Sequence, residues 1–211
     1  MGQIIKFPGP ASKFGFKRVK KRAAAEHPDQ LPLFPRPTAQ ILNFAPELSW
    51  FEQALLWDER GSSKAAECYR KAIEESDCVA DAYCNLGIIE SQKGNTTKAF
   101  DCFTTSLKHD PRHSEAHYNL GNLYFDANDF RLAQIHYELA AEMDPSFPNV
   151  YFNLALVQAI NNELAAAVSA LTKYQALVSE AEGRNADELL SNLKRTLAVA
   201  KNPRFGATGL E

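Results

Sequence analysis

The sequence predicts an all-α protein: an α-solenoid of about four helix pairs, with an extended basic, proline-rich arm before it and a capping helix after it. Three observations support this prediction. Apolar residues recur at helical spacing from Leu48 to about Lys201, this region repeats every 34 residues, and residues 1–46 show neither pattern. The 211 residues are 45% hydrophobic with only ten glycines, which suits one α-rich body with a tail.

The arm, residues 1–46, contains seven prolines and no sustained 3.6-residue periodicity. Each proline removes a backbone donor and biases the preceding residue away from helix, so we expect an extended or disordered segment. Residues 1–22 carry seven lysines and arginines and no acidic residue. Because the formal charge of the whole chain is −3, residues 23–211 carry a charge of −10.

Three segments of the body, residues 80–113, 114–147 and 148–181, align without a gap. Residues 47–79 fit the same pattern if their central turn is one residue shorter, which makes four repeats. Small side chains at matching positions let two helices approach closely, and large ones fill the remaining space. The matching sets are Leu86, Leu120, Leu154; Gly87, Gly121, Ala155; Ala99, Ala133, Ala167; and Phe103, Tyr137, Leu171.

A capping helix is expected within residues 182–201, followed by a tail, residues 202–211. We expect the helix to start after Asn185, because two acidic residues that suit a first turn follow, and leucines continue at helical spacing. Tyr174 stands where the earlier repeats have a small residue. A further ordinary repeat would clash with this ring, so the array should end there.

These repeats resemble the tetratricopeptide repeat family, and the resemblance covers about two thirds of the chain. It implies a right-handed solenoid whose concave groove is lined by the first helix of each repeat and binds extended segments of partner proteins. Tyr118, Phe125 and Phe152 would serve as apolar anchors for the bound segment. The peptide-groove positions that it implies are Asp81, Asn85, Glu115, Tyr118, Asn119, Asn122, Phe125, Asp126, Phe152 and Asn153.

Asn85, Asn119 and Asn153 recur at the 34-residue period, so we expect a ladder of amides along the groove. Each amide offers a donor and an acceptor, which suits the backbone of an extended peptide. The alternative is that these asparagines only make contacts within the repeats.

The groove positions include acidic residues and no lysine or arginine. The basic clamp with which some family members hold acidic C-termini is therefore missing, and the expected ligand is a neutral or basic segment of a partner protein. The chain's own basic arm is one candidate ligand. Alternatively, the arm binds nucleic acid or an anionic membrane surface, or it stays solvated.

Within the arm, Gln30, Leu31, Leu33 and Phe34 resemble the pentapeptide with which bacterial replication and repair proteins dock on the sliding clamp, although Pro32 departs from it. This resemblance supports an alternative function, a nucleic-acid-associated factor recruited by its arm. The other interpretation is that these apolar side chains pack on the first repeat.

No residue pattern indicates an enzyme. His113 and His117 have the i, i+4 spacing of a metal pair, with His109 one turn earlier, but Pro111 interrupts the register, so we expect core or turn roles. The four cysteines form no Cys-x-x-Cys pair and are expected to be buried thiols. Without an apolar stretch of membrane length or a secretory leader, we expect a cytoplasmic adaptor that needs no cofactor.

Overall fold

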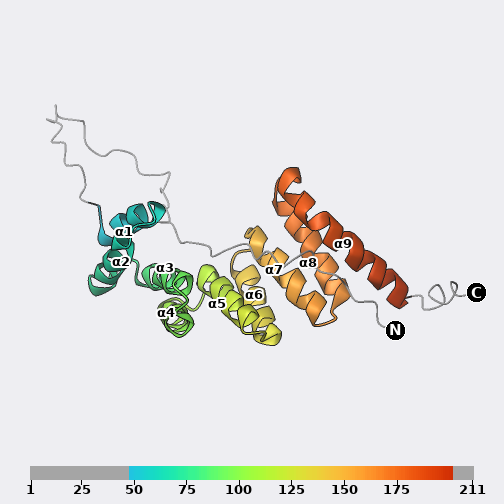
Figure 1. Cartoon of the computed structure of the whole chain (residues 1–211), viewed down its shortest axis with the longest axis horizontal. Coiled ribbons are helices and arrows are strands. Elements are labelled where there is room, and N and C mark those ends of the chain that lie inside the picture. Colours follow the sequence, from blue (N-terminus) through green and yellow to red (C-terminus); the bar gives the residue numbers. More distant parts are fainter. Residues whose placement is uncertain (1–47, 202–211) are drawn as a thin grey trace, which may run out of the picture.

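The computed structural model describes residues 48–201 and confirms the all-α solenoid (Figure 1). The sliding-clamp-like residues Gln30, Leu31, Leu33 and Phe34 lie outside the described residues. In the described part no strand is present, and no helix is long and apolar enough to cross a membrane. The helices are α1 Trp50–Glu59, α2 Lys64–Glu74, α3 Val79–Gln92, α4 Thr96–His109, α5 Ser114–Asp126, α6 Phe130–Met143, α7 Pro148–Ile160, α8 Leu164–Leu177 and α9 Glu180–Lys201.

The helices pack as neighbours in the sequence. Within each repeat the first helix packs on the second, and each second helix then contacts the first helix of the next repeat. In addition, α3 contacts α5 directly, which places first helices beside one another on the tighter side of the stack. We call α1, α3, α5 and α7 the inner layer, and α2, α4, α6 and α8 the outer layer.

The turn inside each repeat uses a left-handed residue at a fixed position. Gly94, Asn128 and Asn162 lie 34 residues apart and have φ values of 79°, 60° and 64°. Glycine and asparagine adopt this conformation at the lowest cost, since other side chains clash with the backbone there. Gly61, with φ 64°, has the same role in the first repeat.

Glycines in α3 and α5 allow these helices to approach α4 and α6 closely. A Cβ atom on Gly87 would lie 2.7 Å from the Phe103 ring, and one on Gly121 would lie 2.5 Å from the Tyr137 ring. The aromatic side chains of the outer layer therefore fill the space that a larger inner residue would need. This packing agrees with the small and large positions of the repeat.

The first turn between repeats is built differently from the later ones. α4 and α6 each end two residues before a proline, but Asp77 stands at the corresponding place in the first repeat. Its carboxylate accepts a hydrogen bond from the Phe51 backbone N–H at 2.9 Å, so it ties the start of α1 to this turn. Ser76 and Cys78 on either side have φ values of 58° and 50°.

The helix α9 closes the solenoid, but it begins at Glu180, earlier than the start expected after Asn185. Ser179 and Glu182 form a reciprocal cap in which each side chain accepts the backbone N–H of the other residue, at 3.5 and 3.2 Å. This Ser-x-x-Glu cap lies six residues before Asn185 and sets the earlier start of the helix. Tyr174 lies 5.3 Å from Phe152, centroid to centroid, and its hydroxyl donates to the Glu182 carbonyl, so it packs under α9.

Candidate peptide-binding surface

Charge is unevenly divided between the two layers. The four helices of the inner layer contain seven acidic residues and no lysine or arginine. The four helices of the outer layer contain seven basic and five acidic residues. The acids of the inner layer are Glu52, Asp58, Glu59, Asp81, Glu90, Glu115 and Asp126.

All ten predicted groove residues lie on inner-layer helices α3, α5 and α7. The asparagines of the predicted ladder are buried and reach back to the preceding repeat. Asn85 Nδ2 donates to the Tyr69 hydroxyl at 3.2 Å, and Asn119 Nδ2 lies 3.5 Å from Cys84 Sγ. These contacts therefore join one repeat to the next, and both asparagines are fully buried in the complete chain.

The third asparagine belongs to a buried polar cluster between the third and fourth repeats. Asn153 Nδ2 donates to Asn122 Oδ1 at 3.0 Å and to the Tyr118 hydroxyl at 3.3 Å, and the Tyr137 hydroxyl donates to the same Asn122 oxygen at 2.8 Å. Burial raises the pKa of Tyr118 and of Tyr137 above the ordinary range, so both phenols stay protonated.

One acceptor of this cluster is unsatisfied. Asn153 is only 1% exposed, and among the described residues its Oδ1 has no hydrogen-bond partner. Buried amide oxygens nearly always accept at least one hydrogen bond, because leaving one unpaired costs roughly 1–3 kcal/mol. Asn153 Oδ1 is therefore a buried acceptor that the described helices leave unsatisfied.

The predicted aromatic anchors pack on neighbouring rings. Tyr118 is fully buried, with its ring centroid 4.7 Å from that of Phe147. Phe125 is half-buried and lies 5.5 Å from Phe130 in an edge-to-face arrangement. Phe152 is 6% exposed, so of the three anchors Phe125 offers the largest accessible ring.

Two acidic residues of the inner layer are held in place by hydrogen bonds to residues at the start of α5. His113 Nδ1 accepts from the Ala116 backbone N–H at 3.2 Å, so Nε2 carries the proton and donates to Asp81 at 3.0 Å. Glu115 accepts from the Ser114 hydroxyl at 2.8 Å. Asp81 and Glu115 thus stand as fixed negative charges at the join of the second and third repeats.

The other histidines that were weighed as metal ligands also have structural partners. His117 Nε2 donates to the Pro111 carbonyl at 3.2 Å, so its Nδ1 is the acceptor for His136 Nδ1–H at 3.1 Å. His109 stacks on Tyr83. His136 was not anticipated, since it lies 19 residues from His117 on another helix. Within residues 48–201 no group of three or more metal-ligating side chains occurs.

Two of the four cysteines are less buried than expected. Cys68 and Cys84 are buried, whereas Cys78 and Cys102 are half-buried. Burial raises the pKa of the Cys102 thiol to about 11 and also raises that of Cys84. Both side chains therefore remain protonated and unreactive at neutral pH.

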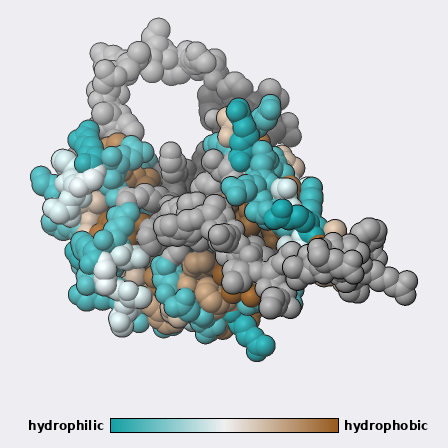
Figure 2. Space-filling model, turned by 45° about the vertical axis from the view of Figure 1, so that its right-hand side comes forward, coloured by the Kyte–Doolittle hydropathy of each residue, from teal (hydrophilic) through white to brown (hydrophobic). Residues whose placement is uncertain are grey.

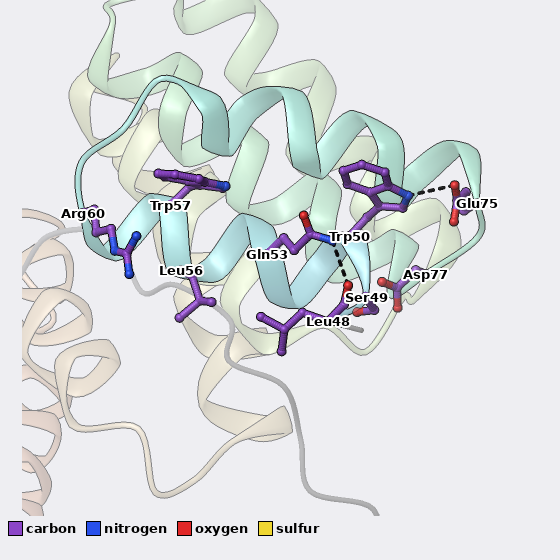
Figure 3. A pocket seen from close by; sticks show the side chains of 9 residues that line it. All are labelled: Leu48, Ser49, Trp50, Gln53, Leu56, Trp57, Arg60, Glu75 and Asp77. Carbon is purple, nitrogen blue, oxygen red and sulfur yellow. Dashed lines mark hydrogen bonds between the residues drawn. The ribbon is translucent and has the colours of Figure 1, made fainter. Parts of the chain in front are cut away.

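A pocket of about 800 Å³ opens at the N-terminal end of the solenoid, where α1 has no preceding helix among the described residues (Figure 3). Trp50 forms one side of it and donates to Glu75 at 2.8 Å. Trp57 is flanked by the Lys64 ammonium group, 4.8 Å from the ring centroid. The pocket is lined by Leu48, Ser49, Trp50, Gln53, Leu56, Trp57, Arg60, Glu75 and Asp77.

The face of the molecule seen in Figure 2 has a mostly hydrophilic rim. Figure 2 shows hydrophilic residues around much of the visible rim, with smaller apolar areas between them. Exposed large apolar side chains include Leu48 and Leu56 at the end pocket, which are 46% and 41% exposed.

Comparison with known proteins agrees with this architecture. A family model described as the tetratricopeptide repeat matches residues 84–130 and 118–182. The first TPR of Spaghetti (RPAP3), solved with the HSP90 peptide SRMEEVD, is 22% identical with a TM-score of 0.52, and the match covers 56% of this chain and 93% of that one.

Two structures of MamA are also similar, each with a TM-score of 0.52. They are 18% and 17% identical, and the matches cover 69% and 77% of this chain and 90% and 94% of theirs. No curated protein matches the sequence. The 34-residue period and the paired helices agree with the matching family model, so residues 84–182 of the solenoid are tetratricopeptide repeats.

Proposed function

We propose that the protein is an adaptor whose inner layer binds an extended, basic segment of a partner protein. The observation that carries the proposal is the charge of this layer, which has seven acidic residues and no lysine or arginine on its four helices. A ligand of opposite charge is favoured there, and a ligand of like charge is repelled.

The fold supports a binding role, because stacked helix pairs present a long inner surface suited to linear segments of other proteins. The similar Spaghetti structure holds the peptide SRMEEVD, which has three acidic residues and one arginine. A ligand of that composition does not suit an inner layer without basic residues. We therefore propose a different peptide class for this chain, and no catalytic role.

The polar cluster supports an extended ligand. Asn153 Oδ1 is a buried acceptor without a partner among the described residues, and a peptide backbone N–H is a donor that every ligand sequence provides. Acidic side chains would select the charge of the ligand, while such amide contacts would fix its position. Asp126, the last residue of α5, and the half-buried Phe125 beside it extend the surface toward the edge of the layer.

Fluorescence anisotropy with two labelled peptides of equal length tests the proposal. One peptide contains lysine, arginine and alanine, and the other contains aspartate, glutamate and alanine. The protein is the full chain with the seven lysines and arginines of residues 1–22 changed to glutamine, called the neutral-arm variant, so that the peptide is the strongly basic segment in the mixture. We expect binding of the basic peptide only, weakening as salt is raised.

Charge variants then locate the site. Glu115→Gln with Asp126→Asn in the inner layer should weaken binding of the basic peptide about 5- to 30-fold, from roughly 0.5–1 kcal/mol for each charge removed. The matched control, Asp101→Asn with Glu138→Gln, removes two charges from the outer layer and should leave binding unchanged. Equal weakening by both pairs, or tighter binding of the acidic peptide, would contradict the proposal.

A further inference from the structure

We infer that the basic segment Phe14–Arg22 of the chain's own arm binds the inner layer of the same molecule and competes with the partner. This inference rests on the proposed function of the inner layer and adds its regulation. The segment contains five of the arm's positive charges and three apolar side chains, in the order Phe14, Phe16, Lys17, Arg18, Val19, Lys20, Lys21, Arg22.

Charge identifies the inner layer as the surface that this segment would select. Residues 1–22 carry seven positive charges and no acid, and the inner layer carries seven acids and no lysine or arginine. The outer layer has an excess of two positive charges, and α9 has four acidic and four basic residues. Among the described helices, only the inner layer therefore attracts the segment strongly.

The acids are spread along the layer as an extended ligand requires. Asp81 lies on the second repeat and Glu115 on the third, and both are held by hydrogen bonds to residues at the start of α5. Asp126 lies at the other end of α5. An extended chain places successive side chains about 3.3 Å apart, so the five basic residues from Lys17 to Arg22 can meet charges at both ends of the helix without folding.

A second observation, independent of charge, also points to a peptide. Asn153 is 1% exposed, and its Oδ1 accepts no hydrogen bond from the described residues. A basic peptide supplies the missing donor through its backbone or through an arginine side chain. The segment Phe14–Arg22 offers both kinds of donor and also brings two phenylalanines for the apolar parts of the layer.

Chain length permits the contact within one molecule. Residues 23–47 connect the segment to the described body, and 25 residues span at most about 85 Å when extended. Helices pack about 8–10 Å apart, so the connection can reach any repeat of the solenoid. A tether of this kind gives an effective concentration on the order of 1 mM, so even a segment with a Kd of about 100 µM would occupy the surface most of the time.

A competition experiment measures how much of the inner layer is occupied by the arm segment. The labelled basic peptide of the previous section is titrated into the natural full chain and into the neutral-arm variant. We expect about tenfold tighter binding to the neutral-arm variant, because an internal competitor at ten times its own Kd weakens the apparent affinity by that factor. Arg36→Gln, which removes an arm charge outside residues 1–22, should behave as the natural chain.

The outcomes separate this inference from the proposed function. If neither chain binds the peptide, the proposed function fails. If both bind it equally, the inner layer binds basic segments but the arm does not occupy it, and the inference is overturned. Equal binding of the acidic peptide by both chains would contradict both statements.

Zero-length crosslinking of lysine to carboxylate detects the contact between the arm segment and the inner layer directly in the natural full chain. We expect mass spectrometry to find Lys17, Lys20 or Lys21 joined to Asp81, Glu115 or Asp126. Mixing labelled and unlabelled chains identifies coupling within one molecule, since the products then carry no mixed label. Equal coupling to the outer-layer acids Asp101 and Glu138, or coupling only between molecules, would overturn the inference.

Discussion

His117 and His136 face each other across the α5–α6 pair with their Nδ1 atoms 3.1 Å apart, and only one of the two nitrogens can carry a proton in that contact. Burial lowers the pKa of His136 to about 4, and it also lowers that of His117. The Pro111 carbonyl fixes the proton of His117 on Nε2. Both rings are therefore neutral at pH 7, and a second proton between the two Nδ1 atoms would break their hydrogen bond.

This pair predicts acid sensitivity. The folded state binds fewer protons than the unfolded state between the unfolded histidine pKa of about 6.5 and the folded value of about 4, so the free energy of unfolding falls as pH drops through this range. Urea unfolding at pH 7 and pH 4.5 measures the loss. His136→Phe, which keeps a ring stacked on Tyr124, should reduce the pH dependence. An unchanged pH dependence in His136→Phe would contradict this role.

At the scale of the helix pair, the close contact of α3 with α4 and of α5 with α6 depends on a glycine opposite an aromatic ring. α5 approaches α6 so closely that a Cβ at Gly121 would lie 2.5 Å from Tyr137, whose hydroxyl is already held by Asn122. The ring cannot retreat without breaking that hydrogen bond. Close packing and the polar cluster are therefore coupled in the third repeat.

Two glycine substitutions should have opposite effects on stability. Gly121→Ala should lower the free energy of unfolding by about 1–3 kcal/mol, because the added methyl group overlaps the Tyr137 ring. Gly183→Ala is the matched control, since Gly183 lies inside α9 and its Cβ would make ordinary contact with Val178, at 3.8 Å. It should raise stability by about 0.5–1 kcal/mol through helix propensity. Urea denaturation followed by circular dichroism measures both, and a stable Gly121→Ala chain would count against the packing argument.

At the scale of the whole molecule, the two ends of the solenoid differ. α9 covers the C-terminal end and buries Leu189 and Leu193 in the largest apolar cluster. At the other end, α1 contacts α2 but has no preceding helix among the described residues, and the first repeat has a smaller cluster. Because each repeat is stabilised mainly by its neighbours, the first repeat should be the least stable.

This difference predicts unfolding that begins at the N-terminal end. Trp50 and Trp57 are the two tryptophans of the chain, and both line the end pocket, so tryptophan fluorescence reports on the first repeat. In urea, the fluorescence midpoint should lie below the circular dichroism midpoint, which follows all the helices. Leu56→Ala at the exposed edge should change neither midpoint much. Coincident midpoints would indicate that the solenoid unfolds as one unit.

Much of the fold could be predicted because its signals are local. The 34-residue period, the glycine and asparagine turns and the prolines after α4 and α6 each act within a few residues, and the ten predicted groove residues all lie on inner-layer helices. The charge difference between the layers is equally visible in the sequence, since it needs only the assignment of each helix to a layer.

Only the tertiary structure decided how these residues are paired. Asn85 and Asn153 reach hydroxyl groups 16 and 35 residues away, and His117 meets His136 from another helix. The early start of α9 depends on the cap between Ser179 and Glu182. Sequence by itself determined the repeat and the location of charge, because both follow from residue type and spacing. Hydrogen-bond partners and burial were decided by the packing of whole helices, because a donor takes the acceptor that the fold brings within about 3 Å.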